Sequence, residues 1–421
     1  MSAECDQPIY MATVSAPTNI ACIKYWGKAS IEYNTPINSS VSVTLDQSDL
    51  CAMTTASASL SYTEDKLWLN GIEETPNKRF YACLNQIRAM AGDKVDPTSG
   101  KVIVSSEQWK QMKVHVSSYN TFPTAAGLAS SAAGYAALVS AFKELFHAKE
   151  SFPGEFTTIA RQGSGSACRS LYGGFVAWRK GSSENGWKNS LAEQVCDEKH
   201  WPEIRALILV VSDQKKTTSS TTGMSNSVST SKLLQHRAEH IVDGRMSEIE
   251  KAFHDKDFPT FAKLTMADSN QFHATCLDTY PPIFYMNDVS KQIIHLIHCY
   301  NEYSGGIRAG YTFDAGPNAV IYTLEKYSLE VAALMLYWFP SKDMKEYLTC
   351  SSNKDIFKKL ESFSLDPELL KATEAIWSLT HEQNQTHVKH VYFTRSGPGP
   401  LVLGEEKALI DTKTGNNSYH R

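Results

Sequence analysis

The chain has 421 residues, of which 42% are hydrophobic and 20% are charged, so it can bury one large core or two ordinary ones. Its formal net charge of −4 gives no overall attraction to nucleic acid or to an anionic membrane, so basic residues that matter must act locally. Nine cysteines form no Cys-x-x-Cys pair, and the N-terminus lacks the basic and apolar segments of a secretory signal. We therefore expect a globular, cytoplasmic protein with reduced thiols.

Apolar periodicity predicts a mixture of short strands and helices in the first half of the chain. The expected strands are 42–45, 67–69, 101–104, 114–117, 173–178 and, as the clearest buried strand, 206–211. The expected helices are one after Gly127 and one near 158–162. The second half is expected to be mainly helical at 231–264 and 290–303, with a strand pair at 319–323 and 388–394 and a helix at 328–337 between them.

This order lacks a regular alternation of strand and helix, which favours an α+β fold over a doubly wound sheet. We place the domain boundary near residue 205, with an N-terminal domain at 1–205 and a C-terminal domain at 206–421. Two uncharged runs are rejected as membrane spans. Residues 125–142 contain too many Ser, Gly and Ala, and residues 331–339 are too few, since about 20 strongly apolar residues are needed.

Residues 120–134 carry the strongest functional signal, because small residues and a serine pair stand where a loop turns into an apolar helix. Gly127 lets the backbone approach an anion, and the first helical turn presents free N–H groups and the positive end of its dipole. Ser130 and Ser131 add hydroxyls for a phosphate oxygen or Mg²⁺. The alternative is a buried Ala-rich helix, against which the polar entry argues. The chain has no Gly-x-x-x-x-Gly-Lys-Ser/Thr sequence, so this is not an ordinary P-loop.

Two further segments combine turns with cations. Residues 19–28 place Lys24 and Lys28 around Tyr-Trp-Gly, which suits phosphate binding by point charges, although an exposed amphipathic stretch is an equal alternative. Residues 163–169 are Gly-Ser-Gly-Ser-Ala-Cys-Arg, a composition found more often in flexible loops. Because Arg169 closes this segment, it can cradle a carboxylate or a phosphate.

Two more segments adjoin predicted strands. Residues 212–224 follow the strand 206–211, where ligand contacts concentrate, although a solvated Ser/Thr loop fits equally well. Within and beyond it, residues 217–230 are expected to form a functional loop that leads into a helix. Asp314 stands between Phe and Ala-Gly-Pro and could cap a turn. Its apolar flanks favour a partly buried carboxylate that acts as a base or orients a reacting group.

Five long motifs, in one order, resemble eukaryotic mevalonate diphosphate decarboxylases of the GHMP kinase superfamily. They are Asn-Ile-Ala-x-x-Lys-Tyr-Trp-Gly-Lys, Phe-Pro-Thr-Ala-Ala-Gly-Leu-Ala-Ser-Ser-Ala-Ala-Gly, Gly-Ser-Gly-Ser-Ala-Cys-Arg-Ser, Met-x-Asp-Ser-Asn-x-Phe-His-Ala-Thr-Cys-Leu-Asp and Tyr-Thr-Phe-Asp-Ala-Gly-Pro-Asn-Ala. The resemblance runs from about residue 12 to about residue 400. It implies a GHMP kinase-like two-domain fold with a left-handed crossover, a ferredoxin-like C-terminal part, a deep central cleft and a homodimer.

The resemblance also implies ATP-dependent decarboxylation of (R)-5-diphosphomevalonate to isopentenyl diphosphate, ADP, phosphate and CO₂, with Mg²⁺ and without an organic cofactor. Asp314 would orient or deprotonate the tertiary hydroxyl, Arg169 would grip the carboxylate, and Lys24 and Ser220 would meet the ATP phosphates. The substrate would be held by Asn19, Tyr25, Lys28, Arg79, Ser164 and Ser166. The nucleotide would be cradled by Ala126, Gly127, Leu128, Ala129, Ser130 and Ser131, with Ser131 as a Mg²⁺ ligand.

The sequence departs from the family pattern in places. Ala29-Ser30 stands where relatives often have Arg-Asp, and residues 179–188 form a polar surface connection; neither is expected to touch the chemistry. The sequence assigns no role to Arg395, which stands within the Gly-rich ending. It also leaves binding order and a peroxisomal fraction undetermined.

Two rival functions stay open at this point. One is a GHMP small-molecule kinase that stops after phosphoryl transfer, for which Arg169 would have no evident purpose. The other is a non-catalytic ligand-binding relative, for which Asp314 would be surplus.

Overall fold

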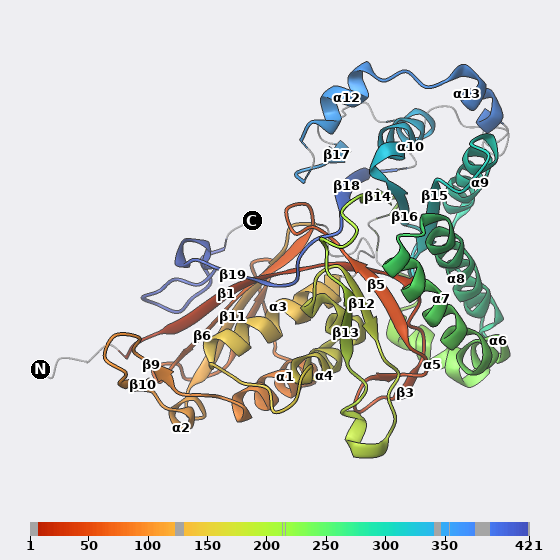
Figure 1. Ribbon diagram of the computed structural model, residues 1–421. Helices are drawn as coiled ribbons and strands as arrows, with labels where there is room; N and C mark the ends of the chain where they lie inside the picture. Colours follow the sequence, from red (N-terminus) through yellow and green to blue (C-terminus); the bar gives the residue numbers. More distant parts are fainter. Residues whose placement is uncertain are drawn as a thin grey trace, which may run out of the picture.

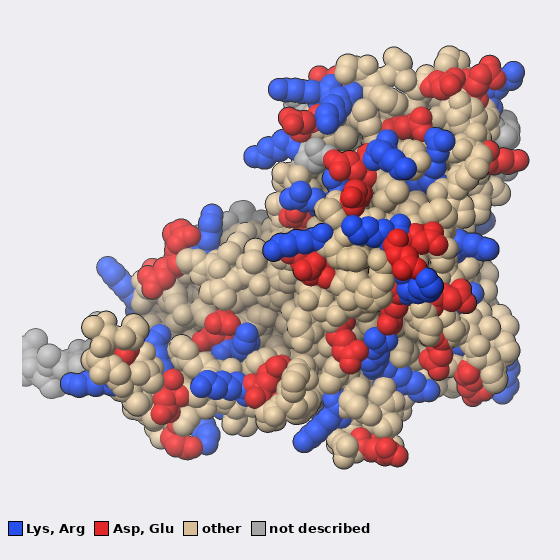
Figure 2. Space-filling model, viewed as in Figure 1, with Lys and Arg blue, Asp and Glu red and all other residues tan. Residues whose placement is uncertain are grey.

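The computed structural model describes residues 7–122, 130–212, 214, 216–340, 347–352, 354–374 and 388–419. Figure 1 shows the N-terminal sheets and their helices as one arm, and the C-terminal sheet with its helices as a second arm at the right. Basic and acidic side chains are intermixed over the face in Figure 2, as the small net charge suggests. Among the described residues, no helix combines the length and apolar composition that a bilayer crossing requires.

A six-stranded sheet forms the base of the N-terminal arm, in the order β19-β1-β6-β11-β7-β8, with only β7 and β11 parallel. Its strands are β1 (Tyr10–Pro17), β6 (Cys51–Ser59), β7 (Lys66–Leu69), β8 (Ile72–Glu74), β11 (Lys113–Asn120) and β19 (Leu401–Leu403). Helix α3 (Ser130–Leu145) packs across β1 and β6. It lies close to these strands because alanines on its inner face meet Ala16 and Ala52.

A four-stranded sheet in the order β13-β12-β5-β2 faces the second arm. Its strands are β2 (Asn19–Ile23), β5 (Ser40–Thr44), β12 (Phe175–Trp178) and β13 (Ala192–Cys196). Every residue of β2 is buried, so the exposed amphipathic alternative for residues 19–28 is wrong for its first half. The strand is short and ends at Ile23, directly before Lys24.

The C-terminal arm is built on a five-stranded sheet in the order β15-β16-β14-β18-β17. Its strands are β14 (Ile204–Val210), β15 (Ala309–Phe313), β16 (Ala319–Leu324), β17 (Leu348–Thr349) and β18 (His390–Arg395). The predicted pairing of 319–323 with 388–394 is wrong, because β14 lies between β16 and β18 and pairs with both. All seven residues of β14 are buried, which explains why this apolar strand takes the centre.

The remaining elements cover these sheets or connect them. In the first half they are α1 (Lys78–Ala89), α2 (Ser106–Trp109), α4 (Glu155–Gly163), η1 (Gly165–Leu171), η2 (Glu184–Trp187), and two ribbons, β3 (Lys28–Ser30) with β4 (Thr35–Pro36) and β9 (Lys94–Val95) with β10 (Val102–Val104). In the second half they are α5 (Ser220–Thr230), α6 (Lys232–His236), the π-helical η3 (Arg237–Ile241), α7 (Val242–Asp255), α8 (Phe258–Asp278), α9 (Asp288–Tyr303), α10 (Glu325–Trp338), α12 (Ile356–Ser362), α13 (Pro367–Thr373) and η5 (Glu405–Lys407).

One hydrophobic core joins the two arms. Ala206, Ile208 and Val210 on one face of β14 pack in the same cluster as Val43 of β5 and Phe261 of α8. The opposite face of β14 belongs to a second cluster with α9 and α10. Because the first cluster includes both sheets, the sheets hold a fixed relation to each other, and the space where they meet can position side chains from both.

The end of the chain adds a second connection. After β18 the chain returns to the N-terminal arm, where Gly397 exchanges backbone hydrogen bonds with Thr44 and Gly174. A Cβ on Gly397 would lie 2.5 Å from the Cα of Asp46, so glycine is required there. Arg395 donates from Nε to the Asp46 carboxylate at 2.9 Å, which gives this arginine a structural role. The predicted boundary at residue 205 stays a prediction.

Candidate active site

A cavity of about 620 Å³ lies where β2, α3, η1, α5 and the turn after β15 converge. Every predicted site residue that the structure describes lines this one cavity. They are Asn19, Lys24, Tyr25, Lys28, Arg79, Ser130, Ser131, Ser164, Ser166, Arg169, Ser220 and Asp314. The predicted nucleotide residues Ala126, Gly127, Leu128 and Ala129 lie outside the described residues.

An ion pair between the two arms stands in this cavity. Lys24 follows β2 and Asp314 follows β15, and the Lys24 Nζ lies 2.7 Å from Asp314 Oδ1. The lysine side chain is only 3% exposed, whereas the aspartate is 32% exposed. The carboxylate can therefore meet a ligand while the buried ammonium fixes one of its oxygens.

Arg169 on η1 is a buried cation that binds neutral side chains. Its Nε donates to Asn19 Oδ1 at 3.2 Å and to Ser42 Oγ at 3.0 Å, and its Nη1 donates to Ser40 Oγ at 2.6 Å. No carboxylate of the described residues lies within ion-pair distance of it. Burial lowers the pKa of its guanidinium from the ordinary arginine value, because a desolvated cation is costly. A bound anion would relieve that cost.

The residues around Arg169 are themselves fixed. Asn19 donates from Nδ2 to the Ser166 carbonyl at 3.0 Å and to Ser170 Oγ at 2.8 Å, which leaves its Oδ1 to accept from Arg169. Segment 163–169 is not the flexible loop that its composition suggested, because α4 runs to Gly163 and η1 begins at Gly165. This helical geometry gives the site a rigid floor.

Serine hydroxyls join α3 to this floor. Ser131 Oγ lies 3.0 Å from Ser164 Oγ, so the two predicted binding hydroxyls form a hydrogen-bonded pair at the cavity. Segment 217–230 also differs from its prediction, since residues 220–230 already form α5 and Ser219 caps this helix by accepting from the Thr222 N–H. Ser220 thus lies in the first turn of a helix, where the dipole favours an anion.

Cations accumulate around the cavity. Burial and the neighbouring Arg79 charge both lower the pKa of Lys28. Burial also lowers the pKa of Lys216, which donates to Ser220 Oγ at 3.4 Å. Each shift reflects a cation that lacks a full set of counter-charges, so a polyanion bound here would be favoured.

Tyr25 offers a buried donor. Its ring packs on Trp178 with centroids 4.7 Å apart, and a Cβ on Gly165 would come within 2.8 Å of the same ring. The hydroxyl is buried and finds no hydrogen-bond partner among the described residues. Burial raises the pKa of Tyr25, so its hydroxyl stays protonated and can donate to a ligand oxygen.

The sequence prediction missed part of the cavity wall. The additional lining residues include Trp26, Asn34, Lys216, Ser219, Thr221, Met224 and Phe272. Lys216 and Ser219 lie in the segment already selected for Ser220, so their charge and hydroxyl could have been included. Phe272 stands in one of the quoted motifs, but it was not selected because an apolar residue in the middle of α8 gives no sign of its own that it lines a cavity.

A second cavity of about 280 Å³ adjoins the first at Ser130 and Ser131. Its wall is mainly apolar and aromatic, with several amide side chains at its polar positions. The lining residues include Leu67, Phe80, Val116, Tyr119, Tyr135, Leu138, Asn70, Asn77 and Asn120. A flat heteroaromatic ring suits a pocket of this composition.

Within the described part of the chain, no three His, Cys, Asp or Glu side chains are grouped closely enough to hold a metal ion on their own. Mg²⁺ does not need such a cage, because it is commonly held by one or two protein oxygens together with ligand phosphates. The oxygen donors at the cavity fit that mode of binding.

Comparison with known proteins shows which family the chain belongs to. Residues 16–192 match the diphosphomevalonate decarboxylase-like N-terminal domain, and residues 206–403 match the mevalonate 5-diphosphate decarboxylase C-terminal domain. The diphosphomevalonate decarboxylase of Homo sapiens is 49% identical over 406 residues, which cover 96% of each chain. The chain belongs to the diphosphomevalonate decarboxylase family. This confirms the family predicted from the motifs.

Solved members of the decarboxylase family have the same fold. The mevalonate diphosphate decarboxylase from Trypanosoma brucei is 34% identical, with a TM-score of 0.83 and coverage of 95% of this chain and 100% of its own. A structure of MDDEF in complex with MVAPP, AMPPCP and magnesium is 30% identical, with a TM-score of 0.67 and coverage of 94% and 99%. The α+β, two-domain GHMP kinase-like fold class is thereby confirmed.

The buried His273 on α8 interacts electrostatically with Lys24 and Asp314. Its ring is edge-on to Phe313, with centroids 6.3 Å apart, and its Nε2 is buried without a partner among the described residues. Burial, and then the charge of Lys24, lower its pKa to about 4. The folded protein therefore keeps His273 neutral at neutral pH.

We expect His273→Gln to make the protein less sensitive to acid. The pKa of His273 is about 4 in the folded protein and 6.5 in its ordinary state, so between these pH values the unfolded chain binds a proton that the folded protein does not. The free energy of unfolding therefore has its full value above pH 6.5. Roughly 3 kcal/mol of the free energy of unfolding is lost as the pH falls towards 4. Urea denaturation at pH 7 and pH 5 measures it: the wild type should lose more stability than the variant. Equal losses would contradict the pKa assignment.

Proposed function

We propose that this cavity catalyses the ATP-dependent decarboxylation of (R)-5-diphosphomevalonate to isopentenyl diphosphate, ADP, phosphate and CO₂. The observation that carries the proposal is the placement of the partly exposed Asp314, paired with Lys24, in the same cavity as Arg169, a buried cation without a carboxylate partner among the described residues. The full-length similarity to diphosphomevalonate decarboxylases supports it.

The reaction needs both kinds of group. The substrate has a tertiary hydroxyl on the carbon β to its carboxylate and lacks a carbonyl that could accept electrons, so direct loss of CO₂ would leave an unstabilised carbanion. Transfer of the γ-phosphoryl group to that hydroxyl creates a leaving group and releases ADP. When phosphate departs with its bonding pair, the electrons of the C–CO₂ bond form the alkene and CO₂ is released.

Asp314 would receive the proton of the tertiary hydroxyl. Its side chain is 32% exposed at the cavity, and its Oδ1 is held 2.7 Å from Lys24 Nζ, so the carboxylate could still contact a ligand. The same ammonium can offset the negative charge of the transferring phosphoryl group, because phosphoryl transfer depends mainly on positioning and electrostatic stabilisation. Lys24 therefore serves the hydroxyl and the phosphate at once.

Arg169 would hold the substrate carboxylate until it leaves as CO₂. Its Nε and Nη1 are anchored by Asn19, Ser40 and Ser42, which fixes the plane of the guanidinium. A fixed plane orients the carboxylate that it binds. The diphosphate and the carbon chain would contact the rest of the predicted set, namely Tyr25, Lys28, Arg79, Ser164 and Ser166.

The nucleotide would lie across the boundary between the two cavities. Its phosphates would meet Ser130, Ser131, Lys216 and Ser220, and its base would occupy the apolar second cavity. The relative MDDEF has been solved with AMPPCP and magnesium. In this chain Ser131 would hold Mg²⁺, which would offset phosphate charge when bound. A homodimer and a cytoplasmic location stay predictions.

A coupled assay for ADP and CO₂ tests the function. Equal amounts of both products support the decarboxylase. ADP without CO₂ would indicate a kinase that stops after phosphoryl transfer, and neither product would indicate a binding protein.

We expect Asp314→Asn to lower kcat by at least ~10²-fold, the low end for losing a positioned acid–base group. ATP binding should change little, because the amide keeps the shape of the carboxylate. Steady-state turnover and nucleotide titration measure the two effects. Asp288→Asn is a suitable control, since Asp288 is an exposed carboxylate at the start of α9. Near-normal turnover of a folded Asp314→Asn protein would remove Asp314 from the chemistry.

We expect Arg169→Lys to cost about 1.5–3 kcal/mol in kcat/KM, because lysine keeps the charge and loses the planar fork. Arg161→Lys is a matched control, since Arg161 is another buried arginine of this region that binds backbone carbonyls and does not line the cavity. Both variants should lose stability, and only the Arg169 variant should lose kcat/KM. Unchanged kinetics at Arg169 would exclude it from the site.

A further inference from the structure

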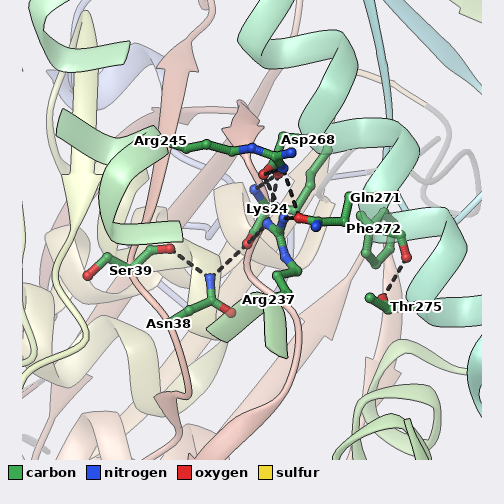
Figure 3. Close-up of polar contacts among 9 residues, drawn as sticks. All are labelled: Lys24, Asn38, Ser39, Arg237, Arg245, Asp268, Gln271, Phe272 and Thr275. Atoms are coloured by element: carbon green, nitrogen blue, oxygen red, sulfur yellow. Dashed lines mark hydrogen bonds and ion pairs between the residues drawn. The ribbon is translucent and has the colours of Figure 1, made fainter. Parts of the chain in front are cut away.

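The main chain of Lys24 is held by a buried charged cluster that lies outside the cavity wall. The cluster consists of Asp268 on α8, Arg237 on η3 and Arg245 on α7. The side chains of Asp268 and Arg237 are fully buried, and Arg245 is 19% exposed. Figure 3 shows Arg237 and Arg245 meeting at Asp268, next to the backbone of Lys24.

The members of the cluster bind one another directly, although Arg237 Nε is buried without a partner among the described residues. Arg237 grips Asp268 with two parallel bonds, Nη1 to Oδ1 at 2.6 Å and Nη2 to Oδ2 at 2.8 Å. Arg245 donates to the same Oδ1 at 2.9 Å, and the Gln271 side-chain oxygen accepts from both arginines. Such a bidentate pair has a defined geometry, which an isolated point charge does not.

Both polar groups of Lys24's backbone bind this network. The Lys24 N–H donates to Asp268 Oδ2 at 2.7 Å, and its carbonyl accepts from Arg237 Nη2 at 3.2 Å. The same carbonyl accepts from Asn38 Nδ2 at 3.1 Å. Lys24 stands after the end of β2, where the sheet no longer pairs its backbone, so these side chains replace the missing strand partners.

Burying one carboxylate and two guanidinium groups is expensive, and apolar residues of similar volume often stabilise a fold as well or better. The cluster therefore needs a reason beyond packing. Asp268 binds the Lys24 N–H, Arg237 binds the Lys24 carbonyl, and the two side chains bind each other. Together they fix the direction in which the Lys24 side chain leaves the main chain. That side chain then reaches Asp314 at 2.7 Å.

We propose that Asp268 and Arg237 are positioning residues that aim the Lys24 ammonium at Asp314 and at the transferring phosphoryl group. This inference rests on the proposed role of the Lys24–Asp314 pair. Neither residue lines the cavity or touches the reacting atoms, so their effect passes through Lys24. A displacement of the order of 1 Å in a reacting group costs up to about 10²-fold in rate.

The test compares Arg237→Lys with Arg245→Lys. Both arginines bind Asp268 Oδ1 and Gln271, but only Arg237 reaches the Lys24 carbonyl. A lysine can keep the charge beside Asp268 and cannot span the carboxylate and the carbonyl together. We expect Arg237→Lys to lower kcat by about tenfold or more, with KM for both substrates within about twofold of wild type. Arg245→Lys should leave kcat within about twofold.

Thermal unfolding of both variants separates positioning from stability. If kcat falls equally in both, or follows the loss of Tm rather than the identity of the arginine, the inference is wrong. A crystal structure of Arg237→Lys should show the Lys24 Nζ displaced from its 2.7 Å contact with Asp314. An unchanged contact in that structure would also overturn it.

Asn38→Ala provides a second test if Arg237→Lys does not fold. This variant removes the Asn38 amide, which is the other donor to the Lys24 carbonyl. It should lower kcat with little change in KM, and normal kcat would count against positioning through this carbonyl. Lys24→Met separates the role of the ion pair from the role of the residues that position it. Normal turnover of Lys24→Met would refute the role of the ion pair itself. An impaired Lys24→Met with normal Arg237 and Asn38 variants would refute only the positioning.

Discussion

The proposed chemistry depends on one contact between side chains that are 290 residues apart, the ion pair of Lys24 with Asp314. In the proposed reaction, the carboxylate that would accept the proton and the cation that would contact phosphate come from different sheets, because each follows the end of a different strand. The shared core of β14, β5 and α8 holds the two sheets, and with them these strand ends, in a fixed position relative to each other. The return of the chain after β18 adds a second connection, through Gly397 and Arg395.

The charge of the cavity differs from the charge of the molecule. The whole chain has a formal net charge of −4, whereas the described lining of the main cavity includes Lys24, Lys28, Arg79, Arg169 and Lys216 against a single carboxylate, Asp314. The lowered pKa values of Lys28, Arg169 and Lys216 have burial as their first cause. Such a site is unfavourable when empty of anions and favours a ligand with a carboxylate, a diphosphate and a nucleotide together.

The sequence predicted local features well and long-range ones poorly. The apolar run at 206–211 and the periodic helix at 290–303 correspond to β14 and α9, because their patterns are strong and continuous. The predicted strand pair failed, because periodicity identifies strands and says nothing about which strand lies between them. The long motifs located most of the predicted cavity residues, since each motif holds its chemistry within a few positions, whereas Arg79 and Ser220 lie outside the motifs.

The cluster of Asp268, Arg237 and Arg245 could not be predicted from the sequence. Asp268 lies within a recognised motif, but Arg237 and Arg245 belong to a helical stretch that gives no sign of burial. Lys24, whose carbonyl Arg237 binds, is 213 residues away from that arginine. A charge in a helix is usually solvated, so only the three-dimensional packing identifies these as buried and paired.

The most direct test of the account is a crystal structure of the Asp314→Asn protein with diphosphomevalonate and AMPPCP. The account predicts that Lys24 Nζ lies between residue 314 and the terminal phosphoryl group, with Arg169 on the substrate carboxylate. A structure in which Lys24 points away from the phosphoryl group, or in which the carboxylate lies away from Arg169, would contradict it.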